Sequence, residues 1–248
     1  MVRELVGGQG DYREYPLRAG ELVCYPPGTG VAHRFYNRSD ADAVFLALSD
    51  KQWNEVCRYP DSGKVMLRAL QQVGTLGEPE AVAAAASAAA AARGVRAVAD
   101  RPAHVVAAGP ERSLDGGVYG RQLSRPAGAR AVFINRDRLS PGARSSPLHW
   151  HTANEELVYV LEGTPTLRQV REGVEEEVAL RPGDVAHWAP GDRVAHQLVN
   201  ASERDAVVLV IGTDVRGDAL ALPEAGTVSV AAAGLSGALT ATGYWFGE

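Results

Sequence analysis

The chain has 248 residues, of which 46% are hydrophobic and 22% charged, and its formal net charge at pH 7 is −5. A chain of this size and composition can bury one large core or two small ones. The mild charge, without a long basic stripe, argues against nucleic acid and anionic membranes as partners. The first residues are charged and broken by glycine, and no later stretch is apolar enough to span a bilayer, so we expect a cytoplasmic protein.

Cys24 and Cys57 are the only cysteines, and their spacing is not that of a metal-binding pair. We expect both to be reduced, buried thiols, because cytoplasmic proteins rarely keep disulfides. A disulfide between them is the alternative.

Several short strands are expected in residues 1–70. Short apolar runs between turn residues predict a hairpin around Gly10, further strands and, after a loop at 59–63, an apolar strand near Val65. The further strands are expected at 22–25, 31–37 and 44–48.

A helix is expected after these strands. Pro79 precedes an almost pure alanine run that ends at Arg93 and Gly94. Alanine is the best helix former, proline suits a first turn, and glycine suits a C-terminal stop. We therefore expect residues 71–100 to form a helical linker, with a loose low-complexity segment as the alternative.

A second series of strands is expected from residue 101 onward. The apolar runs that predict them lie at 105–107, 117–120, 130–135, 157–161, 167–170, 177–180, 194–200 and 207–211. Many short strands separated by Gly and Pro turns favour a double-sheet jelly-roll barrel, and hence an all-β fold class.

One stretch of this second series carries residues suited to metal chemistry. Alternate side chains of a strand share a face, so His149 and His151 direct two imidazoles to the same side. Glu156 opens the following apolar run, where an adjacent strand can bring its carboxylate back to the histidines. His196, in a later strand-like run, is the candidate third imidazole.

Three neutral nitrogens and one carboxylate oxygen suit a divalent transition metal. A six-coordinate ion with four such ligands keeps two positions for water or substrate. The expected cofactor is one iron, manganese, nickel or zinc ion per chain, and the ligand set does not choose among them.

This pattern resembles the cupin superfamily, whose four metal-ligand positions are all present. The first motif of that family corresponds to residues 149–163 and the second to residues 183–200, although the segment from proline to histidine is longer here. The resemblance implies a jelly-roll barrel, the double-stranded β-helix, with the metal inside it. Turn formers are expected at Gly142, Gly163, Gly183, Pro190 and Gly191.

The sequence also contains a repeat. Residues 20–37 align without a gap to residues 183–200, and the register continues to Val65 and Val228. About 17 of roughly 49 aligned positions are identical, which is far above chance and indicates a duplicated unit. The same offset places the counterpart of the first motif before Met1, so the first copy corresponds to the second half of a barrel.

The first copy retains a single motif histidine, His33, which we expect to be a hydrogen-bonded structural residue because one imidazole makes no tight metal site. Its unpaired strand edges need cover, for which we expect a homodimer contact. Cover from the rest of the chain and an upstream start are the alternatives. The expected domains are a partial cupin unit (1–70), the linker (71–100), a complete cupin domain (101–230) and a tail (231–248).

The end of that tail, around Tyr244 and Trp245, and the loop at 59–63 resemble an uncharacterised bacterial two-cupin family. This resemblance brings no known substrate.

Further candidates for the cavity wall share the strand phase of the predicted ligands or lie on a neighbouring strand, namely Val158, Leu198, Asn200 and His187. The repeat counterpart of Asn200 is Asn37, in the copy without a site, which favours a structural hydrogen bond. A position at the surface or rim is favoured for His187. No general acid or base can be assigned from the sequence, so the catalytic residues stay unknown.

Two classes of function are compatible with this pattern. The first is a metal-dependent enzyme that acts on a small oxygen-rich molecule by dioxygenase-, isomerase- or decarboxylase-type chemistry. The alternative is a non-catalytic protein that binds or senses a small ligand, with the first copy in a structural or dimerising role.

Overall fold

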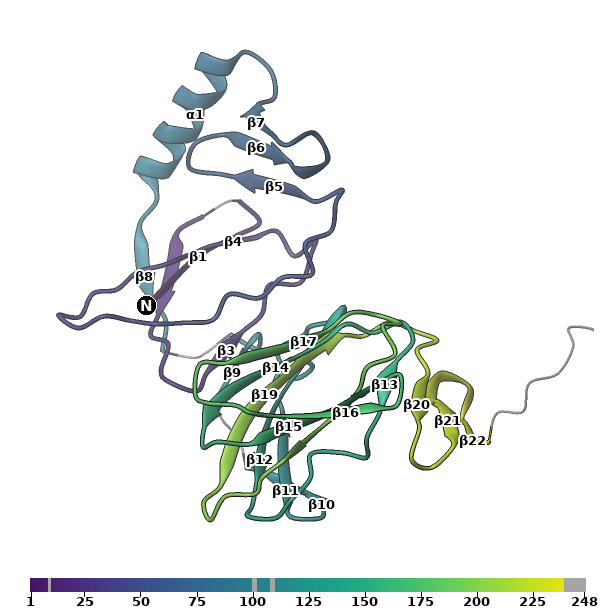
Figure 1. Ribbon diagram of the computed structural model, residues 1–248. Coiled ribbons are helices and arrows are strands. Elements are labelled where there is room, and N and C mark those ends of the chain that lie inside the picture. The colour runs from purple at the N-terminus through teal and green to yellow at the C-terminus, as the bar shows by residue number, and fades with distance from the viewer. Residues whose placement is uncertain (9, 100–101, 108–109, 239–248) are drawn as a thin grey trace, which may run out of the picture. The chain divides into compact units, whose positions relative to one another are not determined.

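The computed structural model describes residues 1–8, 10–99, 102–107 and 110–238 (Figure 1). It divides into two compact units, a first unit Met1–Ala107 and a second unit Ala108–Glu248. Among the described residues, no helix is long and apolar enough to cross a membrane. The predicted tail sequence around Tyr244 and Trp245 lies outside the described residues.

The second unit is a jelly-roll β-barrel, as expected from the sequence. Its larger sheet has the strand order β10-β11-β12-β19-β14-β17, and a three-stranded sheet has the order β16-β15-β18. The strands of the larger sheet are β10 (Arg112–Asp115), β11 (Val118–Gln122), β12 (Val132–Leu139), β19 (Ala206–Thr213), β14 (Glu156–Glu162) and β17 (Val185–Trp188). The strands of the smaller sheet are β16 (Val174–Ala179), β15 (Thr166–Arg171) and β18 (Ala195–Val199).

The core of the second unit follows from the two-residue period of these strands. Along β14, Glu156, Val158 and Val160 are buried while the residues between them are more exposed. Val160 packs with Leu139 of β12 and Val208 of β19, all of them inaccessible to solvent. Each fully buried valine or leucine contributes about 2 kcal/mol of transfer free energy. The same alternation that buries these valines also turns Glu156 inward.

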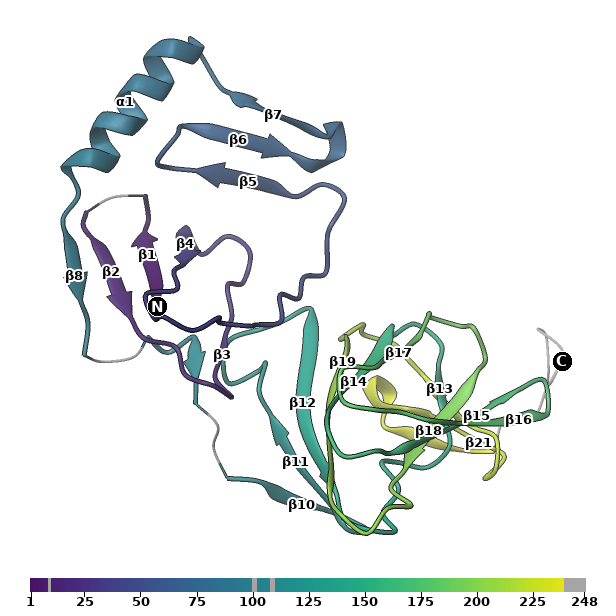
Figure 2. The ribbon, with the colours of Figure 1, turned by 60° about the vertical axis from the view of Figure 1, so that its left-hand side comes forward.

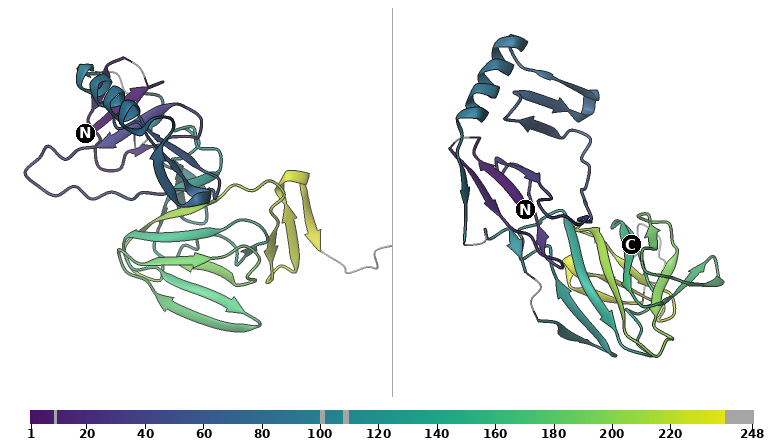
Figure 3. Two further views of the ribbon diagram at one scale, coloured as in Figure 1. Left: turned by 90° about the horizontal axis from the view of Figure 1, so that it is seen from above. Right: turned by 90° about the vertical axis from the view of Figure 1, so that its left-hand side faces the viewer.

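A further sheet lies at one end of this barrel, and Figure 3 shows its strands from residues 220–238 in yellow. Its order is β13-β20-β21-β22, formed by β13 (Trp150–His151), β20 (Leu220–Leu222), β21 (Thr227–Val230) and β22 (Leu235–Ala238). A short 3-10 helix, η2 (Ala231–Ala233), precedes β22. Because β13 pairs with β20, this sheet fixes the segment that carries the predicted histidine pair.

The described part of the first unit contains three sheets, of which Figure 2 shows the largest, β4-β1-β2-β8. Val2, Tyr15 and Val105 form its small buried core. The strands of the largest sheet are β1 (Val2–Val6), β2 (Tyr12–Tyr15), β4 (Val31–Phe35) and β8 (Val95–Ala97). The others are β3 (Leu22–Val23) with β9 (Val105–Val106), and β5 (Val56–Tyr59), β6 (Lys64–Leu67) and β7 (Gln72–Thr75).

The two units repeat the same elements in the same order. The three strands β4-β1-β2 correspond to β18-β15-β16, with the central strand of each set hydrogen-bonded to both neighbours. The meander β5-β6-β7, with the 3-10 helix η1 (Arg68–Leu70) before its last strand, corresponds to β20-β21-β22 with η2. The structure therefore supports the duplication seen in the sequence, and the repeated part extends to the end of β7.

The predicted strand at 44–48 is wrong. These residues have no strand pairing, and Val44 and Phe45 are 95% and 62% exposed. Their counterparts 207–211 lie in β19, which is hydrogen-bonded to β12 on one side and β14 on the other. The described part of the first unit contains no counterpart of either neighbour, so the apolar pattern has no partner with which to form a ladder.

The helix α1 (Pro79–Ala92) forms within the predicted linker, with proline in its first turn. It belongs to the first unit, however, and the strands β7 and β8 on either side of it pair within that unit. β9 likewise pairs with β3, so residues 105–106 close the first unit and do not open the second as expected. Both cysteines are free, as predicted, but each is only half-buried.

Candidate metal centre

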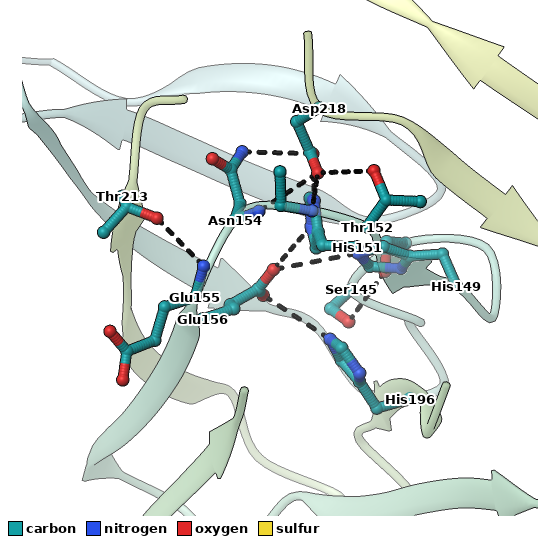
Figure 4. A network of polar contacts seen from close by, with 12 residues as sticks. Ser145, His149, His151, Thr152, Asn154, Glu155, Glu156, His196, Thr213 and Asp218 are labelled. Atoms are coloured by element: carbon teal, nitrogen blue, oxygen red, sulfur yellow. Dashed lines mark hydrogen bonds and ion pairs between the residues drawn. The ribbon is translucent and has the colours of Figure 1, made fainter. Parts of the chain in front are cut away.

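The backbone brings the three predicted histidines together. The peptide groups of His149 and His196 exchange two hydrogen bonds, of 3.3 and 2.8 Å, in an isolated bridge. His151 follows in β13, where it pairs with Leu220 of β20. The two histidines of the first motif are two residues apart in extended chain, so their rings meet at a centroid distance of 5.1 Å. Figure 4 shows all three imidazoles near Glu156.

Glu156 opens β14 between β17 and β19, opposite Trp188 and Gly212. Its Oε2 lies 2.9 Å from Nε2 of His151 and 3.8 Å from Nε2 of His149. The ligand atoms of these three residues all lie within 4.8 Å of one another, so they could hold a metal ion. Glu155, the neighbouring carboxylate, lies elsewhere and pairs with His187 at 2.7 Å.

His196 completes the arrangement from β18. Its Nε2 lies 3.9 Å from Oε1 of Glu156 and, although buried, has no hydrogen-bond partner in the described part of the chain. The ring stacks on the indole of Trp188 with centroids 3.7 Å apart. A buried nitrogen without a partner is costly, and a metal ion is one species that would satisfy it.

The other nitrogen of each imidazole is already engaged. Nδ1 of His149 lies 2.9 Å from the carbonyl oxygen of Pro147, and Nδ1 of His196 lies 3.0 Å from that of Val194. A carbonyl oxygen can only accept, so each Nδ1 carries the proton. Each Nε2 then presents a lone pair to the centre, as metal ligation requires. The residues present therefore suit a divalent transition metal.

The third Nδ1, that of His151, has a carboxylate partner that the sequence did not reveal. Oδ2 of Asp218 lies 2.6 Å from it, and Oδ1 accepts the backbone N–H groups of Ala153 and Asn154 at 2.8 and 3.1 Å. Asp218 thus orients His151 and fixes the turn between the histidines and Glu156. It lies in the loop before β20, and no sequence spacing linked it to the motif.

The charges of the cluster support one another. Burial alone would raise the pKa of Glu156, but the surrounding imidazoles of His149, His151 and His196 outweigh it and hold the pKa well below its usual range. Burial would lower the pKa of His151, but Glu156 and Asp218 outweigh it and raise that pKa. The centre therefore favours an ionised carboxylate.

The cluster lines a cavity of about 250 Å³. The predicted wall residues Val158 and Leu198 lie there. Further lining residues include Asp137, Ser145, Ser146, Trp188, Gln197, Val210 and Leu220. The buried carboxyl group of Asp137 went unnoticed because the sequence pattern of β12 did not fix which of its faces turns inward.

Two predicted wall candidates lie elsewhere. The amide Nδ2 of Asn200 donates to the carbonyl oxygens of Leu139 and Arg204, both at 2.8 Å. Asn37 in the first unit makes the matching bond to the carbonyl oxygen of Ala41 at 2.7 Å. Asn200 therefore has the structural role that its repeat counterpart favoured. His187 is exposed and binds Glu155.

The predicted turn glycines all have positive φ, at Gly142, Gly163, Gly183 and Gly191. Gly163 is also close-packed, because a Cβ there would lie 2.7 Å from the carbonyl oxygen of Asp205 and 2.8 Å from Cα of Ala206. A glycine at this point lets the chain leave β14 directly against the start of β19.

In the first unit, His33 has the same ring stacking as His196, but the described residues provide no counterparts of the other proposed metal ligands. His33 stacks on Tyr25 at 3.6 Å, as its counterpart stacks on Trp188. The carboxylate of the buried Glu4 accepts hydrogen bonds from Tyr25 at 2.9 Å and Arg13 at 2.6 Å, and lies 2.7 Å from Nε2 of His104. Among the described residues, the three-residue group around Glu156 is the one cluster able to hold a metal.

Comparison with known proteins agrees with this architecture. The family model for the cupin domain matches residues 135–212. A sugar phosphate isomerase of the cupin superfamily from Silicibacter pomeroyi is 32% identical, with 45% of this chain and 69% of that chain covered and a TM-score of 0.41. A sugar phosphate isomerase from Acidithiobacillus ferrooxidans, so described provisionally, is 30% identical over 46% and 70% of the two chains, with a TM-score of 0.41.

A polyketide cyclase from Streptomyces resistomycificus is 28% identical over 39% of this chain and 65% of that one, with a TM-score of 0.33. The search among curated proteins found no match. On the domain match and the identity to a structure of that family, the chain belongs to the cupin superfamily.

Proposed function

We propose that the second unit holds one divalent transition metal ion, with His149, His151, Glu156 and His196 as its ligands. The observation that carries this proposal is the set of three imidazoles whose Nδ1 atoms are all engaged while their Nε2 atoms meet one anionic carboxylate. Iron, manganese, nickel and zinc all accept such a set.

The chain's own residues define what the site can do. Glu156 offsets part of the metal charge, and Asp218 holds His151 in the ligating tautomer. The apolar walls from Val158, Leu198 and Val210 limit the water that reaches the centre. When bound, the metal supplies Lewis-acid polarisation of an oxygen ligand or, as iron, a platform for dioxygen. The function proposed is therefore binding of, or reaction on, a small oxygen-rich molecule.

Metal content tests this proposal directly. Protein purified without added metal should contain about one equivalent of a transition metal by elemental analysis, and His151→Ala should lose it. His187→Ala is the matched control, because His187 is exposed and lies outside the cluster. A folded wild-type protein that neither contains nor takes up metal would contradict the proposal.

Enzyme and binder make different predictions for the loaded protein. An enzyme should consume oxygen or convert a candidate acid or sugar, and His151→Ala should abolish that turnover. A non-catalytic binder should show ligand-dependent melting without product. The second outcome would favour the alternative of a binding or sensing protein.

We further propose that the first unit mediates a homodimer through residues 44–48. The segment is apolar and exposed, whereas its counterpart in β19 is paired on both sides, so a second copy of the same segment is a suitable partner. Light scattering should give the mass of two 26.2 kDa chains. Val44→Asp should give one chain, and Val174→Asp, at an exposed position of β16, should leave the dimer intact. A monomeric wild type would refute this contact.

A further inference from the structure

Two buried acceptor oxygens in the cavity lack a donor. Asp137 and Gln197 are 9% and 3% exposed, and Oδ1 of the first and Oε1 of the second have no hydrogen-bond partner among the described residues. Both side chains line the same cavity as the candidate metal ligands. The amide orientation of Gln197 is fixed, because its Nε2 donates to the carbonyl oxygen of Ser146. Its Oε1 is therefore a free acceptor, and a ligand that donates hydrogen bonds would satisfy both oxygens.

The charge of the cavity restricts the charge that a bound ligand can carry. Its described lining residues include the carboxyl groups of Asp137 and Glu156 and no lysine or arginine. Two carboxylates balance a divalent ion, so the loaded site has no net positive charge to offset a dianion. In the metal-free chain, burial together with the charge of Glu156 raises the pKa of Asp137 to about 6.

The size of the cavity suits a small ligand. Its volume of about 250 Å³ corresponds to roughly eight non-hydrogen atoms at about 30 Å³ for each water-sized group. The space holds a molecule of two to four carbons with its oxygens, and the metal leaves two positions for them.

We propose that the cavity selects a small uncharged or singly charged molecule with a hydroxyl beside its metal-binding oxygen, as in an α-hydroxy ketone or α-hydroxy acid, and that Asp137 and Gln197 accept hydrogen bonds from its hydroxyl groups. The inference rests on the proposed metal site and adds the class of ligand. It makes the two residues determinants of specificity that act on the ligand, not on the metal.

Glycolate and oxalate make a matched pair of probes. Both chelate metals through two oxygens, but glycolate carries one negative charge and a hydroxyl donor, whereas oxalate carries two charges and no donor. Cobalt-loaded protein is titrated with each, and with hydroxyacetone as the uncharged probe, while the visible spectrum of the cobalt ion is recorded. We expect glycolate and hydroxyacetone to bind more tightly than oxalate, although oxalate is the stronger chelator in water.

Two variants test whether Gln197 and Asp137 cause the preference for glycolate over oxalate. Gln197→Leu removes an acceptor and should weaken glycolate about tenfold while changing oxalate less than about threefold. Asp137→Asn removes the charge and should shift the preference toward oxalate by about tenfold. His187→Ala should leave both affinities unchanged. Circular dichroism and the cobalt spectrum show whether each variant keeps its fold and its metal.

The outcomes separate the two proposals. A wild-type protein that binds no cobalt overturns the metal site, and this inference with it, before any organic probe is added. A protein that binds cobalt but prefers oxalate overturns the ligand class while the metal site stands. A preference for glycolate that both variants retain unchanged overturns the roles of Asp137 and Gln197.

Discussion

Replacing Asp218 by asparagine should weaken metal binding although none of the four proposed ligands is replaced. Oδ2 of Asp218 lies 2.6 Å from Nδ1 of His151 and accepts Nδ2 of Asn154 at 3.1 Å, while Oδ1 accepts two backbone N–H groups. Every partner of both oxygens is therefore a donor. In either orientation, the new amide nitrogen would face donors, so about half of these bonds are lost.

The magnitude follows from this count. Hydrogen bonds to charged groups are worth about 1.5–3 kcal/mol each. Part of the loss is recovered by water at the edge of the cluster, so we expect the metal-free protein to lose about 2 kcal/mol of unfolding free energy. Loss of the partner that orients a ligating histidine costs about 10- to 100-fold in metal affinity, or about 1.4–2.7 kcal/mol.

Metal affinity is measured by competition with a chromophoric chelator, and stability by urea denaturation of the metal-free protein. Asp214→Asn is the matched control: the same chemical change breaks an exposed pair with Arg125, at 2.7 Å, that contributes at most about 1 kcal/mol. If Asp218→Asn binds metal as tightly as Asp214→Asn, Asp218 does not orient His151 for ligation and the reasoning fails.

Two further predictions concern stability. Gly163→Ala should lower the free energy of unfolding by about 3 kcal/mol and Gly142→Ala by about 1 kcal/mol. Both glycines have a positive φ, +78° and +79°, but only a Cβ at 163 would meet backbone atoms within 3 Å. Equal urea midpoints for the two variants would contradict this reasoning. Asp137 has its pKa raised from 3.8 to about 6, so its ionisation costs folding free energy that is absent below pH 3.8 and complete above about pH 6. Asp137→Asn should therefore stabilise the metal-free protein by up to about 3 kcal/mol at pH 8 and by less than about 1 kcal/mol at pH 4. A gain that does not depend on pH would exclude ionisation as its cause.

The metal cluster was predictable where the chemistry is local in sequence. The alternation that puts His149 and His151 on one face is a property of any extended strand, and the period of β14 selects Glu156 over Glu155. His196 could be found because the repeat and the resemblance supplied its motif. The first two of these inferences needed only a strand and its phase.

Asp218 and Asp137 could not be found in this way. Asp218 reaches His151 only because β20 pairs with β13, a contact between residues 67 positions apart. Asp137 lies on a strand with a polar residue at four consecutive positions from 135 to 138, so the pattern does not show which face is buried. Long-range pairing decides both cases, and a single sequence does not contain it in readable form.

The strand prediction for residues 44–48 was wrong for a related reason. Its composition is that of a buried strand and matches 207–211, yet a strand forms only where neighbouring strands complete its hydrogen bonds. The prediction transferred a pattern from the second copy without transferring β12 and β14. Residues 105–106 form a strand as predicted, but they pair with β3 and therefore belong to the first unit.

Comparison of the two copies distinguishes the local structure that the second motif encodes from the additional residues that the proposed metal site requires. His33 and His196 both stack on the aromatic residue eight positions earlier, and both direct Nδ1 toward the carbonyl oxygen two residues earlier, at 3.5 and 3.0 Å. This geometry survives in the first unit, where Glu4 accepts hydrogen bonds from Tyr15 and Tyr25 and no cluster among the described residues could hold a metal. The motif itself therefore folds the turn and orients the ring. The proposed ligation depends on the chain segment that supplies β13 and β14, because only there, among the described residues, do two more imidazoles and a carboxylate meet the oriented Nε2.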